Sequence, residues 1–395
     1  MMTVFLSRSK MFCYAIMLLV PVIFLFHPWV AFSEEEPLEK ALKTDDAVDD
    51  ELKYLQEETY VITPSKIPQR IEKAPGTIYV VTDKEFRQIG ARYLSEVVQT
   101  VPGWYVDEWF QGETMFFSRG ATGTYSSRIL FMVNSHVVNN VSWGTAIENY
   151  ANLDLDNVKR IEFVSGPLSS LYGSGASAGV INIITKEGDD VDGLQLTARG
   201  GSFDTVEGSA LFGKTIKGLE VAAYLNYRNT EGFRGHVDQD QQSVLDQQYG
   251  THASLAPGNM KGDLYQWDAQ LTMKYMGLKF DGKYIDKKRD DPFGWRPILD
   301  NMSNMQDKDY YLNLSYDVTP TEGLDLMVKA YRNQQSQEWR SHMFPKGALM
   351  MTPTGPMITS ENRVVEGEIK NSRMGAEAQA TYEIVDSNTI VGGIT

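Results

Sequence analysis

Residues 158–186 read VKRIEFVSGPLSSLYGSGASAGVINIITK, and they decide how the first half of the chain is interpreted. Two Val- and Ile-rich runs flank a turn of glycine and serine, so two strands joined by a tight turn are predicted. Glycine-rich turns can also cradle phosphate. However, Gly173, Gly175 and Gly179 give G-x-G-x-x-x-G, one residue too long for a dinucleotide site, and no lysine stands where a Walker motif needs one. The glycines are better explained by turn geometry and close packing.

The residues around this stretch predict a compact α/β domain over 64–188. Strands are expected at Thr77–Thr82 and Arg128–Asn134, where Val, Ile and Leu dominate. A short helix is expected at residues 84–89, and a second at Tyr93–Val101, where an apolar stripe at helical spacing precedes a Pro-Gly pair.

From Leu194 onward the hydrophobic period is two. In Tyr265–Tyr275, apolar side chains alternate with Gln, Asp, Thr and Lys, as in a membrane strand with one lipid face and one water face. A soluble sandwich can share this period, but here short turns alternate with long polar segments, which is typical of outer-membrane barrels. We therefore expect an antiparallel transmembrane β-barrel over 189–395. About nine strands are visible; this odd number and the unpaired last strand predict an incomplete barrel.

The N-terminus predicts export. In residues 1–33, two basic residues precede the apolar run Met11–Phe26, and Ala31–Ser33 offers small residues for cleavage, as in a signal peptide. An uncleaved anchor is the alternative, but the run is short for a membrane helix and contains Pro21. The only cysteine lies within this segment, so the exported chain would contain no disulfide.

Residues 34–57 are rich in Asp and Glu and predict a solvated periplasmic linker. The next residues, ETYVIT at 58–63, favour extended backbone, so they could add as a strand to a partner's sheet. The alternative is an edge strand of the following domain. The formal net charge of −15 argues against a nucleic-acid partner.

Together these motifs resemble the TonB-dependent outer-membrane receptors. The stretch 158–186 resembles the end of their plug domain, and ETYVIT looks like a TonB box. YLSEVVQTVPGWYV at residues 93–106 resembles the plug's helix followed by Pro-Gly, and FFSRG at 116–120 its Arg-Gly motif. RILFMVNSHVVNN resembles the strand that usually carries Asp-Gly at its turn, where this chain has Asn134-Ser135. The resemblance implies an α/β plug inside a 22-stranded barrel.

The resemblance also implies a function. Such a receptor imports a scarce metal chelate, here a ferric siderophore, cobalamin or haem, across the outer membrane of a Gram-negative cell. The TonB box pairs by strand addition with TonB, which transmits energy from its inner-membrane complex. No bond in the ligand is broken, so the protein is not an enzyme, and it needs no cofactor or resident metal. The partners are TonB, the chelate and outer-membrane lipid.

Individual residues follow from the same resemblance. Arg119 and Arg160 match the plug arginines that lock the plug to barrel glutamates, whose positions are expected beyond residue 395. The closing turn of the plug is expected to pack near the barrel wall through its small residues. The TonB box comprises Glu58, Thr59, Tyr60, Val61, Ile62 and Thr63, and the closing turn includes Gly166, Pro167, Tyr172, Gly173, Gly175 and Gly179.

Ligand contacts are expected from aromatic side chains near the plug apex, which could stack on a planar chelate; plug core is the alternative for each. These candidates are Trp104, Tyr105, Trp109, Phe110, Phe116, Tyr125 and Trp143. The histidines His136, His236, His252 and His342 show no metal-ligand spacing and are expected in solvated loops.

Two other functions stay open at this point. One is a passive porin or adhesin barrel, against which the TonB box and plug weigh, because a passive pore needs neither. The other is a truncated, non-transporting remnant of a receptor.

Overall fold

The protein is described by a computed structural model. The described residues are 60–108, 114–121, 123–173, 175–294, 297–385 and 388–394. They belong to one compact unit that begins at Leu55. The predicted signal peptide, the acidic linker, Glu58 and Thr59 lie outside the described residues. Within the described part, no helix is long and apolar enough to cross a membrane.

The first half is an α/β domain around a five-stranded sheet of order β3-β8-β9-β6-β7. The strands β6 and β9 are parallel, and the other neighbours in this sheet are antiparallel. Strands β6 and β9 are short, mostly apolar and almost fully buried, as expected where both faces of a strand are covered. The bounds are β3 Thr77–Thr82, β6 Ile129–Val133, β7 His136–Val137, β8 Val158–Ser165 and β9 Gly179–Thr185.

Short helices and two small hairpins complete this domain. Helix α3 (Asp83–Ile89) begins at a Thr82–Glu85 capping box and ends at Gly90, as its sequence predicts. Helix α4 (Leu94–Val98) is shorter than the predicted Tyr93–Val101, because Pro102 disfavours helical backbone at the preceding residue. The other elements are β1 Tyr60–Val61, β2 Gln69–Arg70, η2 Ile71–Lys73, β4 Trp104–Glu108, β5 Thr114–Ser118, η3 Thr124–Ser126, α5 Ile147–Tyr150, α6 Ser169–Tyr172 and α7 Gly188–Val191.

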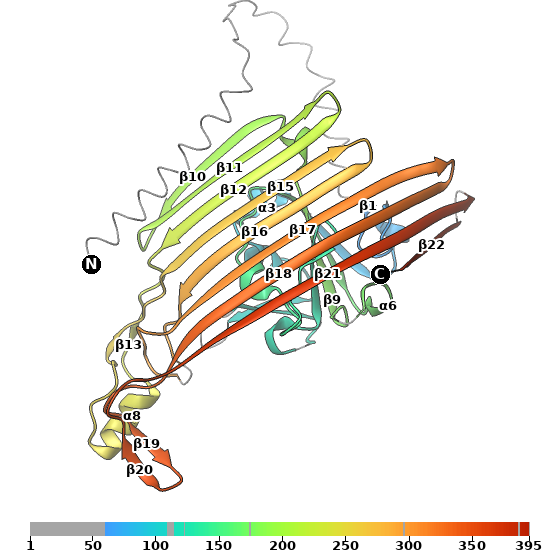
Figure 1. The fold of residues 1–395 in the computed structure, drawn as a ribbon. Coiled ribbons are helices and arrows are strands. Elements are labelled where there is room, and N and C mark those ends of the chain that lie inside the picture. Colours follow the sequence, from blue (N-terminus) through green and yellow to red (C-terminus); the bar gives the residue numbers. More distant parts are fainter. Residues whose placement is uncertain are drawn as a thin grey trace, which may run out of the picture. The chain divides into compact units, whose positions relative to one another are not determined.

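The second half is a nine-stranded antiparallel sheet, which confirms the predicted fold class. The strands follow one another in chain order, from β10 at one edge to β22 at the other (Figure 1). They are β10 Gly193–Gly201, β11 Thr205–Ile216, β12 Leu219–Thr230, β15 Leu264–Tyr275, β16 Leu278–Asp290, β17 Asn304–Thr321, β18 Leu324–Phe344, β21 Arg363–Val385 and β22 Asn388–Ile394.

The connections of this sheet alternate in length as the sequence predicts. Tight turns join β11 to β12 and β15 to β16, where Gly218 and Gly277 have positive φ. Long connections leave the opposite end of the sheet, where Figure 1 shows α8 gathered with β13, β19 and β20. Their bounds are β13 His236–Val237, α8 Gln241–Tyr249, β14 Gly258–Asn259, β19 Leu349–Thr352 and β20 Gly355–Ile358.

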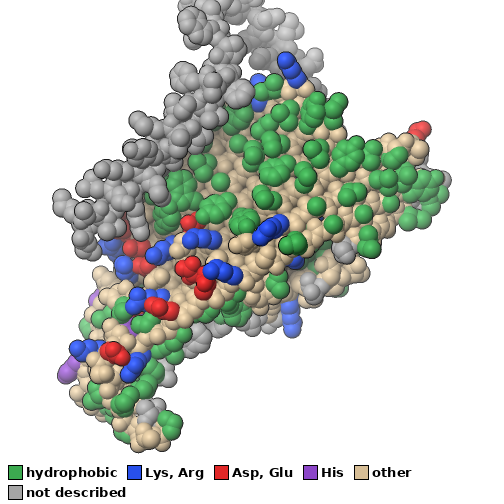
Figure 2. All heavy atoms as spheres, in the orientation of Figure 1, with side chains coloured by type: hydrophobic (Ala, Val, Ile, Leu, Met, Phe, Trp, Pro, Cys, Tyr) green, Lys and Arg blue, Asp and Glu red, His purple; other side chains and the backbone are tan. Residues whose placement is uncertain are grey.

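The two faces of the sheet have the reverse polarity of a soluble protein. Side chains that face the plug are polar and buried, including Asn226, Gln266, Asp268, Gln270, Thr272 and Asp281. The opposite face is apolar and exposed, including Leu271, Leu312, Leu314, Tyr316 and Val328. Figure 2 shows hydrophobic side chains across the visible face, with charged ones gathered toward the end that carries α8. An exposed apolar face on long strands fits a lipid environment.

Candidate functional site

The segment expected to act as a TonB box is held against the plug. Strand β1 pairs with β2, and the side chains of Val61 and Thr63 are fully buried. The carboxylate of Glu162 on β8 accepts hydrogen bonds from the backbone N–H groups of Ile62 (3.1 Å) and Thr63 (3.0 Å). The same Glu162 oxygen accepts from the Thr63 hydroxyl at 2.6 Å. One buried carboxylate therefore holds three donors of the segment.

Two further plug residues complete this clamp on Thr63. The amide of Asn182 on β9 donates to the Thr63 hydroxyl oxygen at 3.0 Å. The hydroxyl of Tyr172, from the glycine-rich closing turn, donates to the Thr63 carbonyl at 2.8 Å. The closing turn therefore has a role that its sequence alone did not reveal. We call Glu162, Asn182 and Tyr172 the Thr63 clamp.

The chain just after the clamp is tied to the sheet. The ammonium of Lys66 lies 2.8 Å from Glu377 on β21 and 5.4 Å from the centre of the Tyr172 ring. Lys329 on β18 approaches the other oxygen of Glu377 at 3.3 Å. Glu377 thus bridges the N-terminal segment to the inner face of two adjacent strands.

The two expected lock arginines are bound within the plug. Arg160 donates to Glu162 Oε1 from Nε (3.2 Å) and Nη2 (3.0 Å), so it orients the carboxylate of the Thr63 clamp. Arg119 donates to the hydroxyl of Thr77. Among the residues that the structure describes, neither arginine pairs with a glutamate of the nine-stranded sheet. Their role as a plug–barrel lock remains a prediction.

A charged cluster that the sequence did not predict joins the plug to the first strands of the sheet. Arg199 on β10 lies 3.1 Å from Asp154 and 3.4 Å from Glu207, and it also pairs with Asp156. The hydroxyl of Tyr224 on β12 donates to Asp154 at 2.5 Å. Burial and the neighbouring Asp156 carboxylate raise the pKa of Asp154 to about 8.

His136 provides a second contact and corrects an expectation. It was expected in a solvated loop, but it is 1% exposed and its Nε2 lies 2.8 Å from Asn333 Oδ1 on β18. Its ring packs on Tyr311, with the centroids 4.7 Å apart. Burial, followed by the Lys329 ammonium, lowers the pKa of His136 to about 3, so the ring is neutral at pH 7. His342 is likewise buried, against Asp300 at 2.9 Å.

The aromatic ligand candidates divide into two groups. Trp104 and Phe116 lie in the hydrophobic core of the plug, so neither offers a face to a ligand. Tyr105 is 58% exposed on β4, and the rings of Tyr125 and Trp143 pack together at 5.4 Å. Trp109 and Phe110 lie outside the described residues.

The glycines of the closing turn contact other parts of the plug or open space. Gly173 and Gly175 have positive φ of 76° and 99°, so their turn needs glycine. At Gly179, a Cβ would meet the Val164 carbonyl at 2.7 Å and the Trp104 ring at 3.0 Å. These neighbours belong to the plug. The expected packing of the closing turn near the barrel wall remains a prediction. Gly166 and Gly173 have no neighbour within 4 Å of such a Cβ, and Pro167 is exposed.

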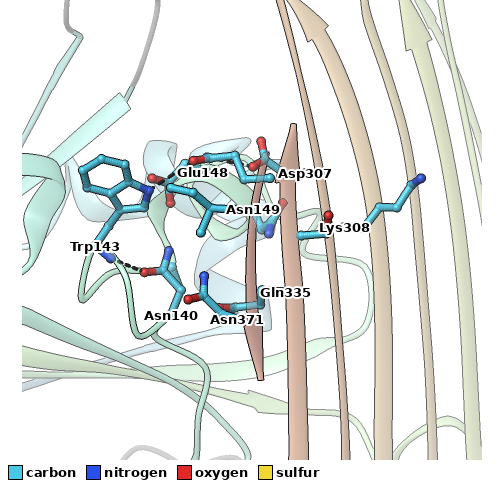
Figure 3. Close-up of a pocket in the computed structure, with 12 residues that line it drawn as sticks. Asn140, Trp143, Glu148, Asn149, Asp307, Lys308, Gln335 and Asn371 are labelled. Carbon is cyan, nitrogen blue, oxygen red and sulfur yellow. Dashed lines mark hydrogen bonds between the residues drawn. The ribbon is translucent and has the colours of Figure 1, made fainter. Parts of the chain in front are cut away.

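A cavity lies where the plug loop around residues 140–149 meets the sheet (Figure 3). Its plug wall includes Trp143, whose indole N–H donates to Gln337 on β18 at 3.1 Å. Its sheet wall comes from β17, β18 and β21. No group of three or more potential metal ligands occurs among the described residues.

Comparison with known proteins identifies the class. Residues 70–180 match the TonB-dependent Receptor Plug Domain family. Together with the fold described above, this match supports a TonB-dependent outer-membrane receptor.

Its relatives include transporters. The vitamin B12 transporter BtuB of Photobacterium profundum is 34% identical over 143 residues, which cover 36% of this chain and 23% of BtuB. The iron-regulated outer membrane virulence protein of Vibrio cholerae is 34% identical over 134 residues, covering 33% of this chain and 20% of that protein. The chain thus spans about a quarter of the length of the curated relatives it matches.

Solved structures support the fold. The ferric-catecholate import receptor Fiu of E. coli K12 superposes with a TM-score of 0.57 at 14% identity, over 85% of this chain and 51% of Fiu. At this identity the likeness concerns the fold alone.

Proposed function

We propose that this protein imports a scarce metal chelate across the outer membrane with energy transmitted by TonB. The proposal rests on one observation: the plug is bound by polar contacts to the polar face of the sheet. Arg199, His136 and Lys66 mark three separate places where buried or half-buried polar groups bridge the two. A barrel filled in this way needs work to open, which a passive porin or adhesin would not.

The proposed point of energy input is the segment 58–63. For these residues to add as a strand to TonB, Thr63 must leave the Thr63 clamp, because its N–H, hydroxyl and carbonyl all bond to plug residues. A pull on the segment would then act directly on β8 and β9, the central strands of the plug, through Glu162 and Asn182. This arrangement supports a mechanical link between TonB and the plug.

The proposed organisation is a signal peptide at 1–33, a periplasmic linker at 34–57, the TonB box at 58–63, the plug at 64–188 and barrel strands from 189. A ferric siderophore, cobalamin and haem all fit the chelate class. The name of one relative, a vitamin B12 transporter, supports cobalamin.

A deletion tests the proposal. Cells that carry the receptor without residues 58–63 should bind the chelate at the surface and fail to accumulate it. A matched deletion of six linker residues, 44–49, should leave accumulation intact. Normal accumulation without residues 58–63 would rule out coupling through this segment.

A further inference from the structure

The turn between β6 and β7 contacts the sheet on one side and the Thr63 clamp on the other. It consists of Asn134 and Ser135, whose φ angles are 49° and 63°. A two-residue hairpin turn with positive φ at both positions favours asparagine at the first position and glycine at the second. A serine at the second position is strained where glycine is not. We therefore expect the Ser135 side chain to make a contact that glycine cannot make.

The side chain of Asn134 binds both β9 of the plug and β16 of the sheet. Its Oδ1 accepts the backbone N–H of Thr185 at 3.0 Å. Because a backbone N–H can only donate, this contact fixes which end of the amide is the oxygen. The Nδ2 end donates to Thr185 Oγ1 at 2.9 Å and to Asp281 Oδ2 on β16 at 2.9 Å. The plug itself thus aims an N–H group of the turn at the sheet.

Asp281 is a fully buried carboxylate, and the partners that the described residues provide for it are donors. The amide of Gln270 donates to its Oδ1 at 3.1 Å, and the hydroxyl of Tyr311 lies 3.3 Å from both oxygens. An ionised carboxylate, which only accepts, fits this set of donors. An aspartate at position 134 would instead bring a second carboxylate within hydrogen-bond distance of the first, and the two would repel.

Ser135 extends the contact from the turn to the Thr63 clamp. Its backbone N–H donates to Asn182 Oδ1 at 3.1 Å, and its hydroxyl oxygen accepts from Asn182 Nδ2 at 3.3 Å. The same amide of Asn182 donates to the Thr63 hydroxyl at 3.0 Å. Asn182 is fully buried, so a lost partner would leave a buried polar group unpaired. Ser135 therefore sets the direction in which Asn182 meets Thr63.

We propose that Asn134, Ser135 and Asp281 are positioning residues for the Thr63 clamp. The clamp stays closed while the turn is bound to Asp281, and a shift of the turn away from β16 withdraws the Ser135 N–H from Asn182. Release of residues 58–63 is thereby coupled to one contact between the plug and the sheet. The inference rests on the proposed function and adds a control on the segment that would pair with TonB.

Labelling of a cysteine at Val61 in isolated outer membranes reports whether the clamp is closed, because Val61 is fully buried. Asn134→Asp preserves the turn, since aspartate tolerates positive φ and still accepts from Thr185. It should accelerate labelling at least fivefold, because two carboxylates then face each other. Adding Asp281→Asn should return the rate to within twofold of the parent, because the introduced amide donates to the introduced carboxylate.

Ser135→Gly separates positioning from folding. Glycine adopts a φ of 63° without strain, so heat-resistant folded receptor should be at least as abundant as in the parent. Loss of the hydroxyl should nevertheless accelerate labelling at Val61 about threefold, a combination that a purely structural role would not produce. As a matched control, Ser142→Ala removes a hydroxyl that donates to Asn371 on β21 at 2.6 Å, and it should leave labelling unchanged.

Unchanged labelling in Asn134→Asp, or a double variant that labels as fast as the single one, would overturn the inference. If Asn134→Asp yields too little folded receptor, recovery of the yield in the double variant supports the contact, and Ser135→Gly decides the coupling. Labelling at the parent rate in Ser135→Gly would contradict the coupling.

These outcomes are separate from the test of import. If labelling contradicts the coupling but deletion of residues 58–63 abolishes accumulation, the import function stands and only the positioning role is wrong. If accumulation is indifferent to that deletion, the proposed function fails, whereas the labelling results still decide how the segment is held.

Discussion

Glu162 is the residue on which the N-terminal segment depends. It is fully buried. One of its carboxylate oxygens accepts hydrogen bonds from Arg160, and the other accepts them from the segment 62–63. Breaking a buried charged pair by removing one partner costs about 3–5 kcal/mol, because the other charge is left uncompensated. The segment is therefore expected to respond strongly to changes at this position.

Glu162→Gln should release residues 60–63 from the plug. The amide group of glutamine cannot accept at both ends, so either Arg160 or the segment loses its acceptor. Labelling of a cysteine introduced at Val61, which is fully buried, should accelerate at least tenfold in this background. As a control, Arg87→Ala breaks an exposed ion pair with Asp83 and should leave labelling unchanged. Unchanged labelling in Glu162→Gln would contradict the clamp.

Asp154 should make the stability of the plug depend on pH. Its pKa of about 8 lies above its ordinary value of 3.8, so between these values the folded state holds a proton that the unfolded state releases. Stability contributed by this group is present below pH 4 and falls as pH rises toward 8, by at most about 1.4 kcal/mol per pH unit.

The variant Asp154→Asn, which mimics the protonated carboxyl, should remove this fall. Protease resistance of the plug should match wild type at pH 5 and exceed it at pH 8. A variant that is less resistant than wild type at pH 8 would show that the ionised carboxylate is the stabilising form.

The sequence could predict some of these residues and not others. Gly173 and Gly175 were assigned to a turn from spacing alone, because positive φ is a local property. His136 was placed in solvent, because its neighbours Tyr311 and Asn333 come from strands far along the chain. The cluster around Arg199 joins residues of the plug to strands β10, β11 and β12. Pairs between such distant residues produce no local pattern in the sequence.

At the scale of elements, the strands were the most predictable part. Alternation at period two survives in β12, β15 and β17 because one face meets lipid and the other meets the plug. Helices were less predictable: α4 ends at Val98, before the apolar stripe does, and the four-residue helix α6 was not expected within the glycine-rich turn.

The lipid face of β15 provides a direct test of this assignment. Leu271→Arg puts a charge in the middle of the strand and should cost about 2–4 kcal/mol, lowering the amount of folded receptor in the outer membrane. Leu278→Arg puts the same charge beside a tight turn, where the cost should be only about 0–1 kcal/mol. Heat-resistant folded receptor on gels measures both. Equal yields would argue against a lipid-facing strand at Leu271.

At the scale of the whole molecule, the polar face of the sheet binds the plug. Its amides and carboxylates would face water in an empty barrel, and here they bond to plug residues such as Asn134, which donates to Asp281 at 2.9 Å. The fold class was predictable because the plug motifs and the sheet pattern are each local. The way in which the plug fits the sheet could not be predicted, because it depends on pairs between residues that are distant in the sequence.

Dependence on the proton gradient distinguishes energised import from passive passage. The measurement compares surface binding and accumulation of a bound chelate in cells with and without a protonophore that collapses the proton gradient. When the gradient is collapsed, we expect binding to be unchanged and accumulation to be lost. Accumulation that continues to the external concentration without a gradient would show a passive channel and rule out TonB-driven import.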